Sequence, residues 1–433
     1  MSFVVFVDLV DYPCKVQLVV ERSKHPSEYE SLCKITKGSY IRTSGAYKND
    51  LQGNPEIDVE NLEIIAQADL NIKSPFDFNG ADPSYGDFVF SFPEIYVSNP
   101  QRAKILKIKT DFVRYLHEYF QKEGFTLVEP PIITDKTLYE EDKAIKAEVH
   151  GEKAFLSQCA TFELEPLALA FGKVYTISPA FRNEPSGSKR HLAEYTHAKA
   201  EALFANLTDL EVLSSNSIYY AISKVQELDR EELRMLGVKL DIDGLRPENQ
   251  EHITYNEALK IIQKKGSTTE WGQGLKRRDE IILTEHFGNK YVWVEFLPFS
   301  SEGFPYRRLP EDRRLSMTCD LIAPHGAGEM VGVAEKITNA EELIENLIEK
   351  GQKHNIRRYW NYIALRRYGL PPHGGIGAAP ERIIYGLLGL DHIRLTKPWP
   401  RYPDRKILTT ENKGLNTYGS QELERLIQKY NLK

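Results

Sequence analysis

One arginine-rich segment has the residue types of a phosphate-binding site. A predicted strand runs into Arg182 and Glu184, and a loop rich in Gly, Ser, Lys and Arg leads to a second strand that starts at His191. Such a hairpin can direct Arg182 at a phosphate, because a guanidinium binds phosphate oxygens in a fixed fork geometry. Lys189 and Arg190 in the loop would then cover the rest of a polyanion. A solvated turn is the alternative interpretation.

A glycine-rich segment follows nearer the C-terminus. Residues 372–379 read Pro-His-Gly-Gly-Ile-Gly-Ala-Ala, and a predicted helix begins near Pro380 with Arg382 in its first turn. The N-terminus of a helix favours anions, and an arginine there adds a fixed positive charge. Glycine-rich runs also serve tight packing alone, so this segment leaves both interpretations open.

Two carboxylates lie between these segments. Asp320 and Glu329 flank a turn that contains Pro, His and Gly. If the turn joins adjacent strands, both side chains can face one pocket and hold Mg²⁺ that bridges nucleotide phosphates. Two exposed acids beside a hairpin are the alternative.

The elements that must position these residues divide the chain into regions. Short, β-branched apolar runs separated by turn residues occupy residues 1–72 and predict a small β-barrel. A segment rich in Pro, Asp and Gly makes residues 73–100 an expected linker. Helix and strand signals then alternate over residues 101–401, with a helical region of mixed charge at about 209–300. A polar extension occupies residues 402–433.

The composition is that of an ordinary globular protein. The 433 residues include 56 Lys and Arg against 62 Asp and Glu, which gives a formal net charge of -6, and 41% are hydrophobic. No apolar run is long enough to span a bilayer and no basic leader precedes the first hydrophobic residues, so we expect neither a membrane protein nor a secreted one. The four cysteines form no CxxC pair, which favours reduced thiols in a cytoplasmic protein.

Together these segments resemble the three signature motifs of the class II aminoacyl-tRNA synthetases, in order and in spacing. The helix that ends at Gly124, with Pro131 beyond it, is similar to motif 1, Phe181–Tyr195 to motif 2 and Gly375–Arg382 to motif 3. The run that starts at Arg366 and reads Arg-Arg-Tyr-Gly-Leu-Pro-Pro-His-Gly-Gly is typical of the asparaginyl branch of the aspartyl, asparaginyl and lysyl group. The resemblance implies an α+β fold, in which a small OB-like barrel precedes an antiparallel sheet flanked by helices. It also implies a homodimer.

The resemblance assigns roles to residues of these motifs. The implied ATP-binding residues are Arg182, Glu184, Arg190, His191, Tyr195 and Arg382. Arg182 would hold the α-phosphate and stabilise charge as pyrophosphate leaves, with Arg382 on the γ-phosphate and Tyr195 stacked on adenine. Asp320 and Glu329 would hold Mg²⁺. The implied reaction joins a carboxylate to ATP as an acyl-adenylate.

The implied acyl pocket departs from the family pattern. Glu165 and Gln158 keep family positions, but Lys199 stands where an acid is usual and Lys336 replaces an arginine that reads the substrate side chain. An ammonium about 4 Å from Lys199 would be repelled by roughly 4 kcal/mol at an effective dielectric constant of about 20. Unless other groups take over, we expect a substrate carboxylate that lacks a free α-amine or that carries a second acid group for Lys199 or Lys336.

The charge distribution argues against tRNA as a partner. Residues 1–90 carry eight Lys and Arg against 14 Asp and Glu, whereas nucleic-acid binding normally needs cations that neutralise phosphates. We therefore expect an ATP- and Mg²⁺-dependent ligase that passes the acyl group to a small amine or ammonia. The alternatives are a working asparagine–tRNA ligase and a catalytically silent regulatory or binding protein.

Overall fold

The structure is a computed structural model that describes residues 3–11, 14–68, 94, 97–183, 188–402, 425 and 428–431. The chain divides into two compact units, residues 1–104 with 408–433 and residues 105–407. Most of the expected linker and of the expected C-terminal extension lies outside the described residues, so the bounds of both stay predictions.

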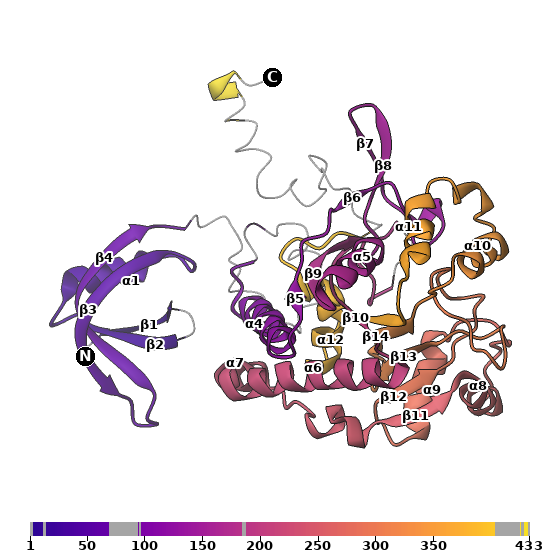
Figure 1. The fold of residues 1–433 in the computed structure, drawn as a ribbon. Helices are drawn as coiled ribbons and strands as arrows, with labels where there is room; N and C mark the ends of the chain where they lie inside the picture. The colour runs from indigo at the N-terminus through magenta and orange to yellow at the C-terminus, as the bar shows by residue number, and fades with distance from the viewer. Residues whose placement is uncertain are drawn as a thin grey trace. The chain divides into compact units, whose positions relative to one another are not determined.

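The described part of the first unit includes a small β-sheet and a helix that packs against it (Figure 1). Its elements are β1 (Val4–Asp11), β2 (Cys14–Glu21), α1 (Pro26–Lys34), β3 (Tyr40–Asn49) and β4 (Pro55–Ala66). The strand order is β1-β2-β4-β3, and β2 pairs with β4 in parallel while the other neighbours are antiparallel. Its core consists of Leu18, Val20, Leu32 and Val59. The sequence predicted the strands but not α1, which supplies Leu32.

The second unit is built on one large sheet. Within the described residues the sheet has the strand order β11-β12-β13-β14-β15-β10-β9-β5, with parallel pairs at its two edges and antiparallel pairs between them. The strands are β5 (Thr126–Leu127), β9 (Lys173–Phe181), β10 (Glu194–Leu203), β11 (Glu251–Thr254), β12 (Val292–Glu295), β13 (Thr318–Ala323), β14 (Gly328–Glu335) and β15 (His373–Ala378). A smaller sheet contains β6 (Ile133–Thr134), β8 (Glu152–Leu156) and β7 (Lys146–Val149). The expected antiparallel sheet is therefore confirmed.

Helices flank the large sheet (Figure 1). They are α4 (Pro100–Lys122), α5 (Thr161–Phe171), α6 (Leu207–Leu228), α7 (Arg230–Leu236), α8 (Tyr255–Lys264), α9 (Arg277–His286), α10 (Ala340–Glu349), α11 (Trp360–Ala364) and α12 (Pro380–Leu387). The helical spacing predicted after residue 101 is confirmed in α4, where Ile108, Phe112, Leu116 and Phe120 are all buried. Gly124 follows the helix with φ at 78°. No helix of the described residues is both long and apolar enough to cross a membrane.

The region at about 209–300 is helical, as expected, but it also extends the large sheet. Helix α6 begins with a capping box formed by Asn206 and Asp209 and packs along β14 and β15. Strands β11 and β12 then form one edge of the sheet. This region is therefore partly built into the sheet.

Helix α5 carries an acid whose environment gives a testable pH dependence. Burial raises the pKa of Glu163 to about 7, and Lys136 offsets part of this effect. Because the usual pKa is 4.5, ionisation costs the folded state stability as pH rises from about 4.5 to 7, and the full cost is present above that range. We expect Glu163→Gln to raise the free energy of unfolding at pH 8 and to change it little at pH 5.

Urea unfolding at the two pH values measures this difference. Glu152→Gln on β8 is the matched control, because Glu152 is exposed and should show no pH-dependent change. An equal effect of Glu163→Gln at both pH values would contradict the assignment.

Candidate active site

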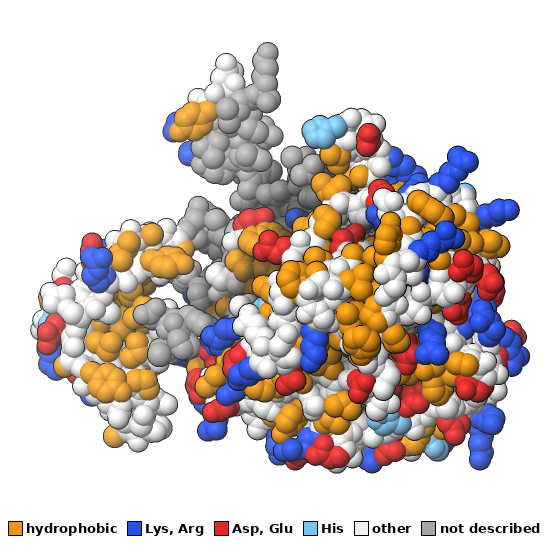
Figure 2. All heavy atoms as spheres, viewed as in Figure 1, with side chains coloured by type: hydrophobic (Ala, Val, Ile, Leu, Met, Phe, Trp, Pro, Cys, Tyr) orange, Lys and Arg blue, Asp and Glu red, His pale blue; other side chains and the backbone are white. Residues whose placement is uncertain are grey.

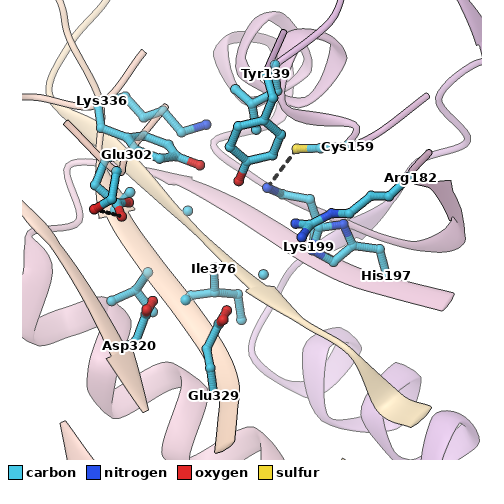
Figure 3. Close-up of a pocket in the computed structure, with 18 residues that line it drawn as sticks. Tyr139, Cys159, Arg182, His197, Lys199, Glu302, Asp320, Glu329, Lys336 and Ile376 are labelled. Carbon is cyan, nitrogen blue, oxygen red and sulfur yellow. Dashed lines mark hydrogen bonds between the residues drawn. The ribbon is translucent and has the colours of Figure 1, made fainter. Parts of the chain in front are cut away.

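A cavity of about 240 Å³ lies over the middle strands of the large sheet (Figure 3). Its lining residues are Leu138, Tyr139, Cys159, Arg182, His197, Lys199, Ser301, Glu302, Tyr306, Asp320, Glu329, Gly332, Val333, Ala334, Lys336, Gly375, Ile376 and Gly377. Five residues predicted from separate segments meet here, namely Arg182, Lys199, Asp320, Glu329 and Lys336. The large sheet thus brings the candidate phosphate-binding and acyl-binding residues into one cavity.

Opposite charges face each other across this cavity. Glu302, Asp320 and Glu329 lie on one side, and Arg182 and Lys199 lie on the other (Figure 3). A bound substrate therefore meets carboxylates at one end and Arg182 and Lys199 at the other, while Lys336 lies on the same side as Glu302 (Figure 3). This polarity suits a reaction in which phosphates and a carboxylate must be held together.

Arg182 follows β9 and lies near two tyrosine rings. Its guanidinium carbon is 5.4 Å from the ring centroid of Tyr139 and 5.8 Å from that of Tyr195. Its backbone N–H donates to the carbonyl oxygen of Ala193 across the hairpin at 2.9 Å. Burial raises the pKa of Tyr195, whose neutral hydroxyl donates to the carbonyl oxygen of Gln158 at 3.4 Å. The two rings restrict the orientation of the guanidinium at the wall of the cavity.

The two predicted metal-binding acids share one hairpin. Strands β13 and β14 are antiparallel neighbours, with Asp320 opposite Gly332, and both Asp320 and Glu329 reach the cavity. A Cβ at Gly332 would lie 3.1 Å from Asp320 Oδ1 and 3.8 Å from Glu329 Oε1. Burial, together with Glu329 and Glu302, raises the pKa of Asp320 well above its usual value. Crowded carboxylates of this kind fit a divalent cation, which would neutralise them.

Arg382 and Arg190, both predicted to bind ATP, have different surroundings in the structure. Arg382, in the first turn of α12, donates to the carbonyl oxygen of Glu329 at 3.0 Å and lies 3.8 Å from its carboxylate. Arg190 is buried, pairs with Glu280 of α9 at 2.6 Å and is not a cavity residue. Arg190 therefore makes a buried ion pair with an acid 90 residues away, and its contact with a phosphate stays a prediction.

Two further ATP-binding residues, His191 and Glu184, were predicted from this segment of the sequence. Nδ1 of His191 is 2.7 Å from Ser188 Oγ, and the side chain is half-buried. Glu184 lies outside the described residues. The roles of His191 and Glu184 stay predictions.

The glycine-rich segment forms β15, and its glycines open the floor of the cavity. A Cβ at Gly375 would lie 2.4 Å from Glu201 Oε2, and one at Gly377 would lie 2.9 Å from His197 Nε2. Neighbouring side chains therefore leave room for glycine only. The structure shows the tight packing of these glycines, and anion binding by the start of the following helix and Arg382 stays a prediction.

Lys199 projects from β10 into the cavity beside Cys159. Its ammonium donates to Cys159 Sγ at 3.1 Å (Figure 3), and no carboxylate oxygen of a described residue lies within 4.0 Å of it. His197 lines the cavity nearby, and burial together with Lys199 and Arg182 lowers its pKa well below the usual value. His197 is therefore neutral, and Lys199 has no paired acid among the described residues.

Lys336 is already neutralised, contrary to expectation. Its Nζ lies 3.0 Å from Glu201 Oε2 and 3.3 Å from Glu165 Oε1, and it donates to Thr161 Oγ1 at 2.6 Å. The ammonium and both carboxylates are buried. A second acid group of a substrate would find Lys336 already paired with two carboxylates, and substrate binding by Lys336 stays a prediction.

Glu165 and Gln158, predicted to bind substrate, lie behind the cavity wall. Glu165 is fully buried and pairs with Arg366 at 2.5 Å. Oε1 of Gln158 accepts hydrogen bonds from the backbone N–H groups of Leu138 and Tyr139 at 3.0 and 3.2 Å. These contacts position the residues that line the cavity.

The cavity residues that were not predicted include Glu302, Tyr139 and Tyr306. They lie in segments without a helical or strand period. Burial and the nearby Glu329 raise the pKa of Glu302 to about 7. One signal was available, because Glu302 is the only charged residue in the run 296–306.

Comparison with known proteins places this geometry in a family. A family model described as tRNA synthetases class II (D, K and N) matches residues 89–403. The chain is 32% identical over 390 residues to the asparagine–tRNA ligase of Desulforamulus reducens, and the matched region covers 89% of this chain and 88% of that protein. It is 31% identical over 408 residues to the asparagine–tRNA ligase of Pyrococcus horikoshii, across 93% and 92% of the two chains.

Solved structures agree with the sequence relatives. The asparaginyl-tRNA synthetase of Pyrococcus horikoshii complexed with asparaginyl-adenylate superposes with a TM-score of 0.86 at 28% identity, over 94% of each chain. The asparaginyl-tRNA synthetase of Entamoeba histolytica in complex with asparaginyl-adenylate gives 0.81 at 25% identity, over 93% and 92%.

Proposed function

We propose that this protein, which belongs to the class II tRNA synthetases of the D, K and N type, activates asparagine with ATP and transfers it to tRNA. Membership of this family makes the chain an adenylate-forming ligase. One observation carries this proposal. The cavity sets Arg182 opposite Asp320 and Glu329 in a chain that its asparagine-specific relatives match over about nine-tenths of its length.

The relatives do not support the function first expected from the sequence, an amide ligase that acts without tRNA. That expectation rested partly on Lys336, whose charge is neutralised by Glu165 and Glu201. The relatives favour the alternative, asparagine–tRNA ligase. A silent binding protein is disfavoured as well, because the chain belongs to a family of ligases.

In the first step, the carboxylate of asparagine would attack the α-phosphorus of ATP, so that a P–O bond forms and pyrophosphate leaves. Arg182 would bind the α-phosphate and stabilise the charge that develops on its oxygens. Mg²⁺ held by Asp320 and Glu329 would supply positive charge to the phosphates. Arg382, which lies beside Glu329, would bind the γ-phosphate and so hold the departing pyrophosphate.

In the second step, a hydroxyl of the terminal ribose of tRNA would attack the acyl carbonyl. A C–O ester bond forms and AMP leaves. The same Arg182 would then stabilise the negative charge of the departing AMP.

Lys199 would determine the orientation of asparagine in the cavity. An α-ammonium about 4 Å from Lys199 would be repelled by roughly 4 kcal/mol at an effective dielectric constant of about 20. We therefore place the carboxylate of asparagine toward Arg182 and Lys199, and its ammonium toward Glu302 on the opposite side.

ATP–pyrophosphate exchange tests the proposal with asparagine, aspartate and succinamic acid, which is asparagine without its α-amine. Exchange with asparagine supports it. Exchange with succinamic acid alone would support a second candidate, favoured by the unpaired Lys199, in which the ligase activates a carboxylate that lacks a free α-amine. Exchange with none of the three would contradict both.

Lys199→Met should raise the KM for asparagine in this assay by about 10- to 100-fold, because a charge-assisted hydrogen bond contributes about 1.5–3 kcal/mol. The KM for ATP should change little. Lys146→Met, at an exposed position of β7, is the matched control. A lower KM for asparagine in Lys199→Met would mean that the ammonium, not the carboxylate, lies beside Lys199.

A further inference from the structure

The most basic stretch of the chain lies outside the cavity. Residues 350–368 contain six Lys and Arg and no Asp or Glu, in a chain whose net charge is -6. Three of these six cations are engaged elsewhere in the fold: Lys350 with the carbonyl oxygen of Phe299, Arg358 with Glu141, and Arg366 with Glu165. The other three are Lys353, Arg357 and Arg367, and all three are exposed.

The exposed cations lie on the outer side of the segment. Lys353, Arg357, Trp360 and Arg367 are spaced by four, three and seven residues along short helical elements at Lys353–Asn355, Trp360–Ala364 and Leu365–Tyr368, which a turn at 356–359 interrupts. The opposite side of the segment packs into a buried cluster that contains Phe162, Phe304, Tyr359, Tyr362 and Ile363. The face formed by Lys353, Arg357, Trp360, Arg367 and Tyr368 is called the basic face below.

The neighbouring acids do not neutralise the basic face. The acids of α10 that pair with other arginines are Glu342 and Glu345 with Arg313, and Glu349 with Arg308. Glu341 reaches Arg367 at 3.7 Å, and both of these side chains are more than 60% exposed, so the pair is screened by water. Across the part of the chain that the structure describes, no carboxylate oxygen lies within 4.0 Å of Lys353 or Arg357. Figure 2 shows Lys and Arg side chains gathered over α10 and α11.

Two aromatic rings lie among these cations. Trp360 is 47% exposed and Tyr368 is 85% exposed, and the guanidinium of Arg367 lies 5.9 Å from the ring of Trp360. Exposed rings beside exposed cations suit RNA, because unpaired bases stack on aromatic side chains while Lys and Arg neutralise phosphates. An acidic protein surface would use the cations but would leave the rings in water.

The basic face is also tied to the wall of the active site. Behind it, the hydroxyl of Tyr359 donates to the carbonyl oxygen of Thr137 at 2.9 Å, and the next residue, Leu138, lines the cavity. We propose that the basic face binds tRNA, with Lys353, Arg357 and Arg367 on phosphates and an unpaired base stacked on Trp360 or Tyr368. This inference rests on the proposed function, since it takes the RNA to be the acyl acceptor.

Binding of fluorescently labelled, deacylated tRNA to the full-length chain over a series of potassium chloride concentrations tests the proposal. The triple variant Lys353→Glu, Arg357→Glu, Arg367→Glu should raise Kd at least about 10-fold at low salt. The triple variant should also make the plot of the logarithm of the association constant against the logarithm of the salt concentration less steep, by about 2–3. Each phosphate that a cation neutralises contributes about 0.7–0.9 to this slope. The matched control is Lys260→Glu, Lys264→Glu, Lys265→Glu on and just after α8, which changes the net charge equally at exposed positions.

Variants of Trp360 distinguish the contribution of base stacking to tRNA binding from that of charge. Trp360→Ala should weaken tRNA binding by about 10-fold without changing the salt slope, and Trp360→Phe should restore most of the affinity. A structural defect would instead alter ATP–pyrophosphate exchange, which should stay within about twofold in all these variants.

The outcomes distinguish this inference from the proposed function. If asparagine supports no exchange while tRNA binding depends on the basic face, the proposed function fails and the RNA surface stands. The inference is overturned if the two triple variants bind tRNA equally well, if the wild-type chain does not bind tRNA at low salt, or if poly-glutamate binds as tightly as tRNA.

Discussion

Replacing Glu165 with glutamine is expected to destabilise the chain by about 3–5 kcal/mol, because it leaves buried cations without their counter-charge. Glu165 pairs with Arg366 at 2.5 Å, Lys336 at 3.3 Å and His373 at 3.3 Å, and all four side chains are almost completely buried. It also accepts a hydrogen bond from Tyr362. Burial alone would raise the pKa of Glu165, but Arg366, Lys336 and His373 hold it well below its usual value, so the carboxylate is ionised.

Urea unfolding at pH 8 measures this loss. Glu163→Gln, two residues away on the same helix, is the matched control and should change stability in the opposite direction at that pH. A loss of less than about 1 kcal/mol in Glu165→Gln would show that the network does not support the wall of the cavity.

Replacing Arg182 with alanine should lower kcat for asparagine-dependent ATP–pyrophosphate exchange by about 100- to 1000-fold. This is the range seen when one group that stabilises transition-state charge is removed. The guanidinium is held beside Tyr139 and Tyr195 at the cavity wall, so little reorganisation is needed when charge develops on the α-phosphate. Arg182→Lys should recover only part of the rate, because an ammonium lacks the fork geometry of a guanidinium.

Arg278→Ala is the control for this experiment, because Arg278 is an exposed arginine of α9 outside the cavity. Its exchange rate should match that of the wild-type chain. If Arg182→Ala kept more than about one-tenth of the wild-type kcat, Arg182 would have no part in the chemistry.

The local elements of the site could be predicted because their signals are short-range. The four-residue spacing of Ile108, Phe112 and Leu116 predicted α4, and the turn after Asp320 predicted a hairpin that also carries Glu329. Both patterns depend on residues within a few positions of one another, so the sequence contains all the information that they need.

The ion pairs of the site could not be predicted, because their partners come from distant segments. Arg190 pairs with Glu280 on α9, and Lys336 pairs with Glu165 on α5 and Glu201 on β10. A basic residue in a phosphate-binding motif gives no sign of whether the fold will supply it with a buried acid.

The same limit applies to the acidic side of the cavity. Glu302 lies in a segment with no repeating pattern, and only the folded chain places it near Asp320 and Glu329. The N-terminal helix α1 was missed for another reason, since Leu32 is its only fully buried residue and gives almost no helical period.

Charging of unfractionated tRNA with radiolabelled asparagine tests the proposed function most directly. The full-length chain with ATP and Mg²⁺ should accumulate acid-precipitable label on tRNA, and Arg182→Ala should abolish most of it. Rapid pyrophosphate exchange with asparagine but no label on tRNA would contradict transfer to tRNA, and would mean that the adenylate made here serves another acceptor.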